Sequence, residues 1–244
     1  MPRLRAASVD LLAIAAHPDD AELTCGGTLA KAARQGYVVG ILDLVAGESG
    51  SRGSAERRME ESERAAAALG VRRRGNAGLR DAHLHNSDGA RRVVVEWIRH
   101  YRPRTVILPF PVGRHPDHRV ASELGRDACY LAGLARYDAN GRPHRPVKIL
   151  YALAYREDPV KPTFVVDISA TFAAKMKAIG CYRSQFEGAR QAGEIFPTGQ
   201  DLRGLIATQS AHYGSLIRAR YGEPFFTHET VSVDDVVALD VQSM

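Results

Sequence analysis

The chain has 244 residues, of which 45% are hydrophobic and 25% are charged, and these proportions exclude disordered, collagen-like and small disulfide-stapled proteins. A net charge of +5, from 33 basic and 28 acidic residues, favours anionic partners without identifying one. The three cysteines, Cys25, Cys129 and Cys181, form no C-x-x-C pair, so they indicate neither a disulfide framework nor a thiolate zinc site and fit a reducing cytoplasm.

The first ten residues carry two arginines but no apolar stretch of the length that a signal peptide needs. No apolar run along the chain approaches the length of a membrane span. We therefore expect a cytoplasmic protein that makes no membrane contact.

An apolar run, Leu11 to Ala16, predicts a buried strand that stops at the polar cluster His17-Pro18-Asp19-Asp20. Gly26 and Gly27 then open a segment, Thr28 to Gln35, that we expect to be helical. Gly36 closes that helix, and Tyr37 to Val45 again has the composition of a strand. Together these elements predict a βαβ unit.

Two further helices have recognisable starts. Ser54 can cap a helix that runs to Leu69, with Gly70 just beyond its end. Asp88 can cap a second one, in which Val94, Trp97, Ile98 and others share one face. Residues Thr105 to Phe110 follow as a strand.

A second polar cluster, His115-Pro116-Asp117-His118, precedes apolar residues at helical spacing between Val120 and Leu131. Strands are expected at Ile149 to Ala154 and at Phe164 to Ile168, and a loop at Tyr137 to Pro146. Alternating strands and helices predict an α/β fold with a mostly parallel sheet covered by helices on both faces. We expect one domain over residues 1–244.

The two polar clusters each place His and Asp around a Pro after a predicted strand, at the edge of the sheet where ligands bind in α/β folds. His17 and Asp20 can converge on one point, and His118 can supply a third ligand. Two imidazoles and one carboxylate suit zinc and leave a coordination position free for water, which is typical of a catalytic site.

Neighbouring residues of both clusters predict the remaining roles. Asp19 can act as the general base that takes a proton from the attacking water. His115 can stabilise the oxyanion as an imidazolium and then protonate the leaving amine. Asp117 is expected to orient His115 and to raise its pKa above the ordinary value of about 6.5.

Other polar residues have plainer interpretations. The run Arg72–Arg74 is expected on a solvated face, as charge runs usually are. The remaining histidines are expected at the surface, and Cys25 is expected to be a small core residue rather than a ligand.

The sequence resembles the LmbE-like (PIG-L) family of zinc-dependent N-acetylglucosaminyl deacetylases, and within it the branch of bacillithiol biosynthesis. The paired signatures are Ala16 to Asp20 with Glu22, and His115 to His118. Further matches extend the resemblance over about Leu11 to His228: they are Gly47-Glu48, Arg52-Gly53, Arg58, Glu60-Glu61, Gly78 to Asp81, Arg114, Lys175, Tyr182 to Phe186 and Tyr221 to Phe225.

The resemblance implies a Rossmann-like three-layer sandwich, the zinc ligands His17, Asp20 and His118, and Asp19 as base with His115 at the oxyanion. It implies N-acetylglucosaminyl L-malate as substrate, a small anionic glucosaminide. Arg58, Arg114 and Arg145 resemble the anion-binding arginines of the family, and forked guanidinium groups suit carboxylates. It also implies a homo-oligomer, often a hexamer in this branch.

The sequence leaves two alternatives open, another substrate and another metal, and disfavours a third. The same zinc chemistry would serve an inositol conjugate or a chitooligosaccharide. The triad of ligands also suits Fe(II), which can occupy the site in cells or indicate a non-haem iron enzyme. A nucleic-acid-binding protein is disfavoured, because the arginines are scattered and no helix-turn-helix, zinc finger or aromatic platform is present.

Overall fold

The protein is described here by a computed structural model, covering residues 8–50, 52–153, 160–186 and 201–241. One seven-stranded sheet forms its centre, with strand order β3-β2-β1-β4-β5-β7-β6. The strands are β1 (Leu11–Ala15), β2 (Val39–Val45), β3 (Arg73–Leu79), β4 (Thr105–Pro109), β5 (Lys148–Ala152), β6 (Phe164–Asp167) and β7 (Gly222–Phe226). The helices are α1 (Asp20–Arg34), α2 (Ala55–Leu69), α3 (Asp88–Tyr101), α4 (Pro116–Leu131), α5 (Phe172–Ile179), α6 (Arg183–Phe186) and α7 (Leu202–Ser215).

The sheet is mostly parallel, which confirms the predicted α/β class. β1 pairs in parallel with β2 and β4, and the parallel pairing continues to β3 on one side and to β5 on the other. β7 is antiparallel to both of its neighbours, β5 and β6. The chain builds outward in opposite directions from β1 and β4, so the point between these two strands is the topological switch, where α/β folds bind ligands.

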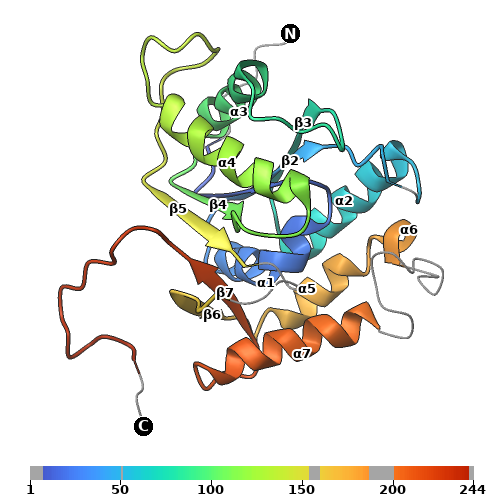
Figure 1. Cartoon of the computed structure of the whole chain (residues 1–244). Helices are drawn as coiled ribbons and strands as arrows, with labels where there is room; N and C mark the ends of the chain where they lie inside the picture. Colours follow the sequence, from blue (N-terminus) through green and yellow to red (C-terminus); the bar gives the residue numbers. More distant parts are fainter. Residues whose placement is uncertain (1–7, 51, 154–159, 187–200, 242–244) are drawn as a thin grey trace.

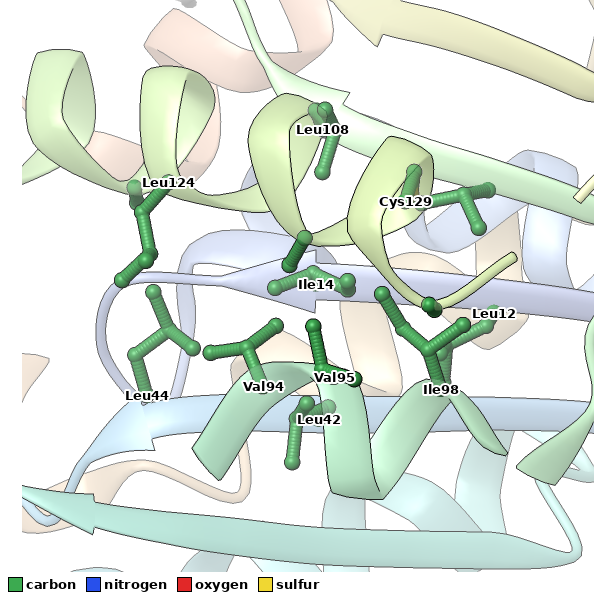
Figure 2. Close-up of a cluster of buried hydrophobic side chains, with 14 of the residues drawn as sticks. Leu12, Ile14, Leu42, Leu44, Val94, Val95, Ile98, Leu108, Leu124 and Cys129 are labelled. Carbon is green, nitrogen blue, oxygen red and sulfur yellow. The ribbon is translucent and has the colours of Figure 1, made fainter. Parts of the chain in front are cut away.

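Helices cover both faces of the sheet (Figure 1). On one face α3 and α4 pack against alternate side chains of β1, β2 and β4, among them Ile14, Leu42 and Leu108 (Figure 2). On the other face α1, α2 and α5 cover the intervening side chains, such as Ala15, Ile41 and Ile107. The two interleaved sets follow from the alternation of side chains along a strand.

Helix α1 begins eight residues before the position that its glycines suggested. The expected helix was Thr28 to Gln35, whereas the observed one starts at Asp20 and is broken at Cys25, where φ is −138° and ψ is 15°. The break releases backbone N–H groups, and the Glu223 carboxylate accepts hydrogen bonds from Gly27 (2.8 Å) and Thr28 (2.7 Å). Gly26 and Gly27 therefore do open a helical segment, but as the second half of a kinked helix.

The other predicted elements agree closely with the structure. Ser54 caps α2 by accepting a hydrogen bond from the backbone of Arg57, and Gly70 ends that helix in a left-handed conformation. The cap of α3 is Ser87, one residue before the expected Asp88. The loop predicted at Tyr137 to Pro146 has neither helix nor strand, and the last residue of the strand predicted at Ile149 to Ala154 lies outside the described residues.

Candidate metal centre

Both polar clusters lie at the switch point of the sheet. The first occupies the turn from β1 into α1, and the second follows β4 and begins α4. His115 is the N-cap residue of α4, with Pro116 in the first turn, where its missing N–H costs nothing. Because β1 and β4 are adjacent and parallel, the two clusters meet at one edge of the sheet, although they lie about one hundred positions apart in the sequence.

The structure brings the three predicted metal ligands together. Nδ1 of His17 lies 3.2 Å from one carboxylate oxygen of Asp20, and Nε2 of His118 lies 3.1 Å from the other. One ligand atom from each residue lies within 4.8 Å of the others. This spacing can hold a metal ion with two nitrogen ligands and one oxygen ligand.

An unsatisfied nitrogen supports a metal at this position. Among the described residues, Nε2 of His118 is buried and has no hydrogen-bond partner of good geometry. Buried polar atoms are rarely left in that state, so such an atom indicates a missing ligand or ion. A second close group, His17 with His115 and Asp117, contains no such unsatisfied atom within the described residues. There the backbone N–H of Ala82 donates to the Asp117 carboxylate, and the backbone N–H of Asp117 donates to Nδ1 of His115.

The other ring nitrogen of His17 faces two carboxylates. Nε2 lies 3.2 Å from Asp81 and 3.4 Å from Asp117. Asp81 is fixed in turn by the N–H groups of Ser49 and Ala82. A carboxylate behind a ligand imidazole sets its tautomer and orientation, so Asp81 and Asp117 support His17.

The charge of His17 is governed by these neighbours. Burial alone lowers its pKa, but hydrogen bonds with Asp117, Asp20 and Asp81 outweigh burial and raise the pKa to about 12. The hydrogen bond with His17 also lowers the pKa of Asp81 to about 2. The spacing of the motifs assigned no role to Asp81, because its approach to His17 depends on the path of the segment after β3, and β2 separates that strand from β1.

Asp19 occupies the same turn but has a different environment. Its backbone is left-handed, with φ at 111°, a conformation that a non-glycine residue adopts only under constraint. Burial and the charge of Asp20 raise the pKa of Asp19 to about 8, although Arg58 lowers it. A cation bound at the adjacent proposed ligands would lower the pKa of Asp19 again. The pKa would then lie near the range that a general base requires.

His115 differs from the expectation. Its Nδ1 accepts a hydrogen bond from the backbone N–H of Asp117 at 3.2 Å, while the Asp117 carboxylate faces His17 instead. Burial and the nearby rings of His118 and His17 lower the pKa of His115. The predicted raised pKa of His115 is therefore wrong for the protein without a metal, because Asp117 supports a different histidine.

Two of the three predicted anion-binding arginines lie near the site. Arg58 is buried below the loop that contains Gly47, and its guanidinium donates a hydrogen bond to Gln185. Gly47 has φ at 76°, and a β-carbon there would collide with Arg58. Arg114 is exposed and directly precedes His115.

Arg145 lies elsewhere. Its guanidinium is 4.4 Å from the ring centroid of Tyr130 and donates a hydrogen bond to the Tyr130 carbonyl. Tyr130 is about 18 Å further along α4 than His118, at about 1.5 Å per residue. The expected substrate contact of Arg145 is thus not formed within one chain, because the length of α4 separates it from the metal ligands.

The run Arg72–Arg74 was expected on a solvated face, and this is wrong for its last member. The side chain of Arg74 is only 8% exposed and binds both carboxylate oxygens of Asp43, at 2.7 and 3.0 Å. It also donates to Glu22 at 2.6 Å, which accepts a further hydrogen bond from Tyr182. This paired network joins β2, β3, α1 and the segment before α6 beneath the metal centre.

Comparison with known proteins places this site in context. A family model described as PIG-L, GlcNAc-PI de-N-acetylase, matches residues 12–129, which include both clusters. The chain is 31% identical over 229 residues to a diacetylchitobiose deacetylase from Thermococcus kodakarensis, covering 87% of this chain and 80% of the relative. It is similar to a conserved protein from Thermus thermophilus of known structure, with 38% identity, a TM-score of 0.83 and coverage of 92% and 97% of the two chains.

Two further relatives differ in the named substrate. A probable N-acetyl-α-D-glucosaminyl L-malate deacetylase 2 from Bacillus cereus is 28% identical, covering 72% of this chain and 84% of the relative. A 1D-myo-inositol 2-acetamido-2-deoxy-α-D-glucopyranoside deacetylase from Rhodococcus jostii is 26% identical, covering 87% and 93%. These relatives share the deacetylation of an N-acetylglucosamine unit and differ in what that unit is attached to.

Proposed function

Because the chain belongs to the PIG-L family of GlcNAc-PI de-N-acetylases, we propose that it is a zinc-dependent hydrolase that removes the acetyl group from the nitrogen of an N-acetylglucosaminide. The chain is an enzyme, and its relatives support an N-acetylglucosamine-type deacetylase activity. The observation that carries the proposal is the convergence of His17, Asp20 and His118 at the switch point of the sheet.

His17, Asp20 and His118 would hold the zinc ion. Bound there, zinc polarises a carbonyl and makes water acidic enough to supply hydroxide near neutral pH. The unsatisfied nitrogen of His118 and the mixed nitrogen and oxygen ligands support this assignment. The same ligands suit Fe(II), so iron is the alternative occupant in cells.

The protein's own groups account for the proton transfers. Asp19 takes a proton from the attacking water, whose oxygen forms a bond to the acetyl carbonyl carbon. His115, in its imidazolium form, donates a hydrogen bond to the oxyanion and then a proton to the sugar nitrogen as the carbon–nitrogen bond breaks, and the proton that Asp19 took from water restores the imidazolium. Asp117 acts through His17, holding that proposed ligand in place, and its negative charge favours the protonated form of His115. The products are acetate and a free amine.

We propose N-acetylglucosaminyl L-malate as the substrate, in bacillithiol biosynthesis. The malate-specific relative supports this choice, as do Arg58 beside Asp19 and the exposed Arg114 beside His115, since guanidinium groups bind carboxylates well. An inositol conjugate and diacetylchitobiose are the alternatives. Each of them is the substrate in the name of another relative, at 26% and 31% identity respectively.

Acetate release from a panel of N-acetylglucosaminides tests the proposal. The purified protein, loaded with zinc or with iron, is assayed on the malate, inositol and chitobiose compounds. We expect kcat/KM on the malate compound to exceed the values on the other two by about tenfold or more. The inositol and chitobiose compounds are neutral, so they cannot form the contacts between arginine and carboxylate that malate can form. A higher value on another compound would reassign the aglycone, and no acetate from any of them with either metal would disprove the deacetylase assignment.

A further inference from the structure

A small apolar cavity lies beside the metal ligands at the carboxyl ends of β1 and β4. Asp20 and His118 form one side of it, and its volume is about 30 Å³. The rest of its lining is mostly aliphatic and includes Ala15, Ile107 and Ala152, while Thr24 and Cys25 add a hydroxyl and a thiol. The Thr24 hydroxyl already donates a hydrogen bond to the carbonyl of Asp20. The cavity therefore meets the metal centre directly and is mostly apolar.

The polar groups of the site lie on another side. Asp81, Asp117 and His115 gather around His17, and none of these four residues lines the cavity. A ligand held at the metal centre therefore has polar partners in one direction and aliphatic surface in another.

An acetamide has the same division. Its oxygen and nitrogen need polar partners, and its methyl group gains most from an apolar surface. We infer that this cavity binds the acyl methyl group of the substrate and limits the length of acyl chain that the enzyme removes. This inference rests on the proposed deacetylase function and adds residues that determine acyl specificity.

The volume decides which acyl groups fit. A water molecule needs roughly 10–15 Å³ of such space, so a cavity of about 30 Å³ accepts a methyl group and little more. Ala15, Ala152 and Ile107 come from adjacent β1, β5 and β4 and are almost fully buried. Since packed interiors yield little to added volume, a propionyl or butyryl chain would meet strands that cannot move aside.

The experiment uses N-formyl, N-acetyl, N-propionyl and N-butyryl forms of the glucosaminide that gives the highest rate in the panel. We expect the wild type to favour acetyl over propionyl by about tenfold or more in kcat/KM, and over butyryl by more. Ala152→Val fills the cavity and should lower the acetyl-to-formyl ratio by about tenfold, because the formyl group has no methyl. Ile107→Val removes one methyl group from the wall and should bring the acetyl and propionyl rates together.

Ile41→Val is the matched control. It removes the same methyl group from β2, in the same core cluster but outside the cavity, and should leave all the acyl ratios unchanged. Calorimetric titration with acetate, propionate and butyrate gives a readout independent of turnover: the wild type should bind acetate most tightly, and Ile107→Val should reduce that preference.

The outcomes separate the two proposals. Similar rates for all four acyl groups, or an unchanged acetyl-to-formyl ratio in folded Ala152→Val, would overturn the acyl cavity while leaving the deacetylase intact. If Ala152→Val fails to fold, the Ile107→Val and Ile41→Val pair decides alone. Absence of hydrolysis for every acyl group in the wild type would instead refute the proposed function.

Discussion

Asp19 is the residue whose backbone is most constrained in the metal centre, with φ at 111° between Pro18 and the ligand Asp20. The proposed ligand Asp20 and the proposed base Asp19 are adjacent in sequence, and both have to face one point without competing for the metal. The left-handed conformation lets Asp20 enter α1 while Asp19 stays outside the set of ligands. The strain thus serves the separation of binding and proton transfer.

Asp19→Ala should lower kcat for acetate release by a factor of about 10²–10⁴, the usual contribution of a general base. Zinc content should stay at the wild-type level, because Asp19 is not a proposed ligand. The check is turnover measured together with metal analysis. Near-normal turnover with zinc retained would remove Asp19 as the base.

Metal binding should release protons. In the metal-free protein His17 has a pKa of about 12, raised by its hydrogen bonds with carboxylates, so its ring is protonated at pH 7 and must lose a proton before it can bind. Since the proton competes with the metal below that pKa, affinity should rise with pH between about 6 and 9. Calorimetry in buffers of different ionisation enthalpy measures the released protons, and uptake without proton release would contradict the assigned ligand.

At the residue scale, motifs predicted which residues converge at the switch point but not their side-chain partners. His17 and Asp20 follow the end of β1, and His118 lies in the first turn of α4, which follows the adjacent β4. Asp81 as the support of His17, and Asp43 as the partner of Arg74, depend on contacts between separate strands. Spacing along the chain carries no information on such contacts.

The kink in α1 is the main feature at the scale of elements. The carboxylate of Glu223 in β7 binds the freed N–H groups of α1 and also accepts a 2.6 Å hydrogen bond from buried Lys175 of α5. One side chain therefore joins three elements beneath the ligand Asp20. Its replacement should affect the whole fold.

Glu223→Ala should lower the free energy of unfolding by about 3–5 kcal/mol, because it leaves the Lys175 charge buried and unpaired. Urea denaturation measures the change. Glu60→Ala, at an exposed position on α2, is the control and should change stability by less than about 0.5 kcal/mol. A loss below about 1 kcal/mol in Glu223→Ala would show that this pair does not secure the kink.

Gly47→Ala and Gly36→Ala form a matched pair. Both positions have positive φ, but a β-carbon at Gly36 meets no other atom, whereas one at Gly47 collides with Arg58. Both variants should lose roughly 1–2 kcal/mol of stability. Only Gly47→Ala should also lower kcat/KM, by about tenfold or more, because Arg58 is displaced beside Asp19; equal kinetic effects in the two variants would refute that role of Arg58.

Elements with a clear hydrophobic period were predictable, and those without one were not. β3 contains Arg73, Arg74 and two glycines, and β7 contains Pro224, which is unusual inside a sheet. Both are strands because tertiary pairing outweighs their weak propensity. The start of α1 was missed because its break is stabilised by a residue nearly two hundred positions away.

For the molecule as a whole, the predicted parallel sheet is confirmed, while a homo-oligomer and a cytoplasmic location stay predictions. Within the described ranges no helix is both long and apolar enough to cross a membrane. After β7 the chain leaves the body of the protein (Figure 1), and Val236 and Val237 there are 77% and 91% exposed. The described part of this segment, residues 228–241, is exposed and adds no side chain to the hydrophobic core.

Removal of residues 231–244 should therefore leave the free energy of unfolding within about 0.5 kcal/mol of the full chain, as for surface changes that touch no core. Thermal or urea denaturation at low protein concentration measures it. A larger loss would show that the segment packs against the protein, within one chain or between copies.

The bond between Glu223 and α1 also has a consequence for synthesis. All the proposed ligands are translated by residue 118, yet the helix that carries Asp20 is secured by Glu223, more than one hundred positions later. On the ribosome, the nascent chain thus carries every metal-binding side chain long before its supporting carboxylate emerges. Stable metal acquisition should therefore follow the emergence of Glu223 rather than accompany synthesis of the two clusters.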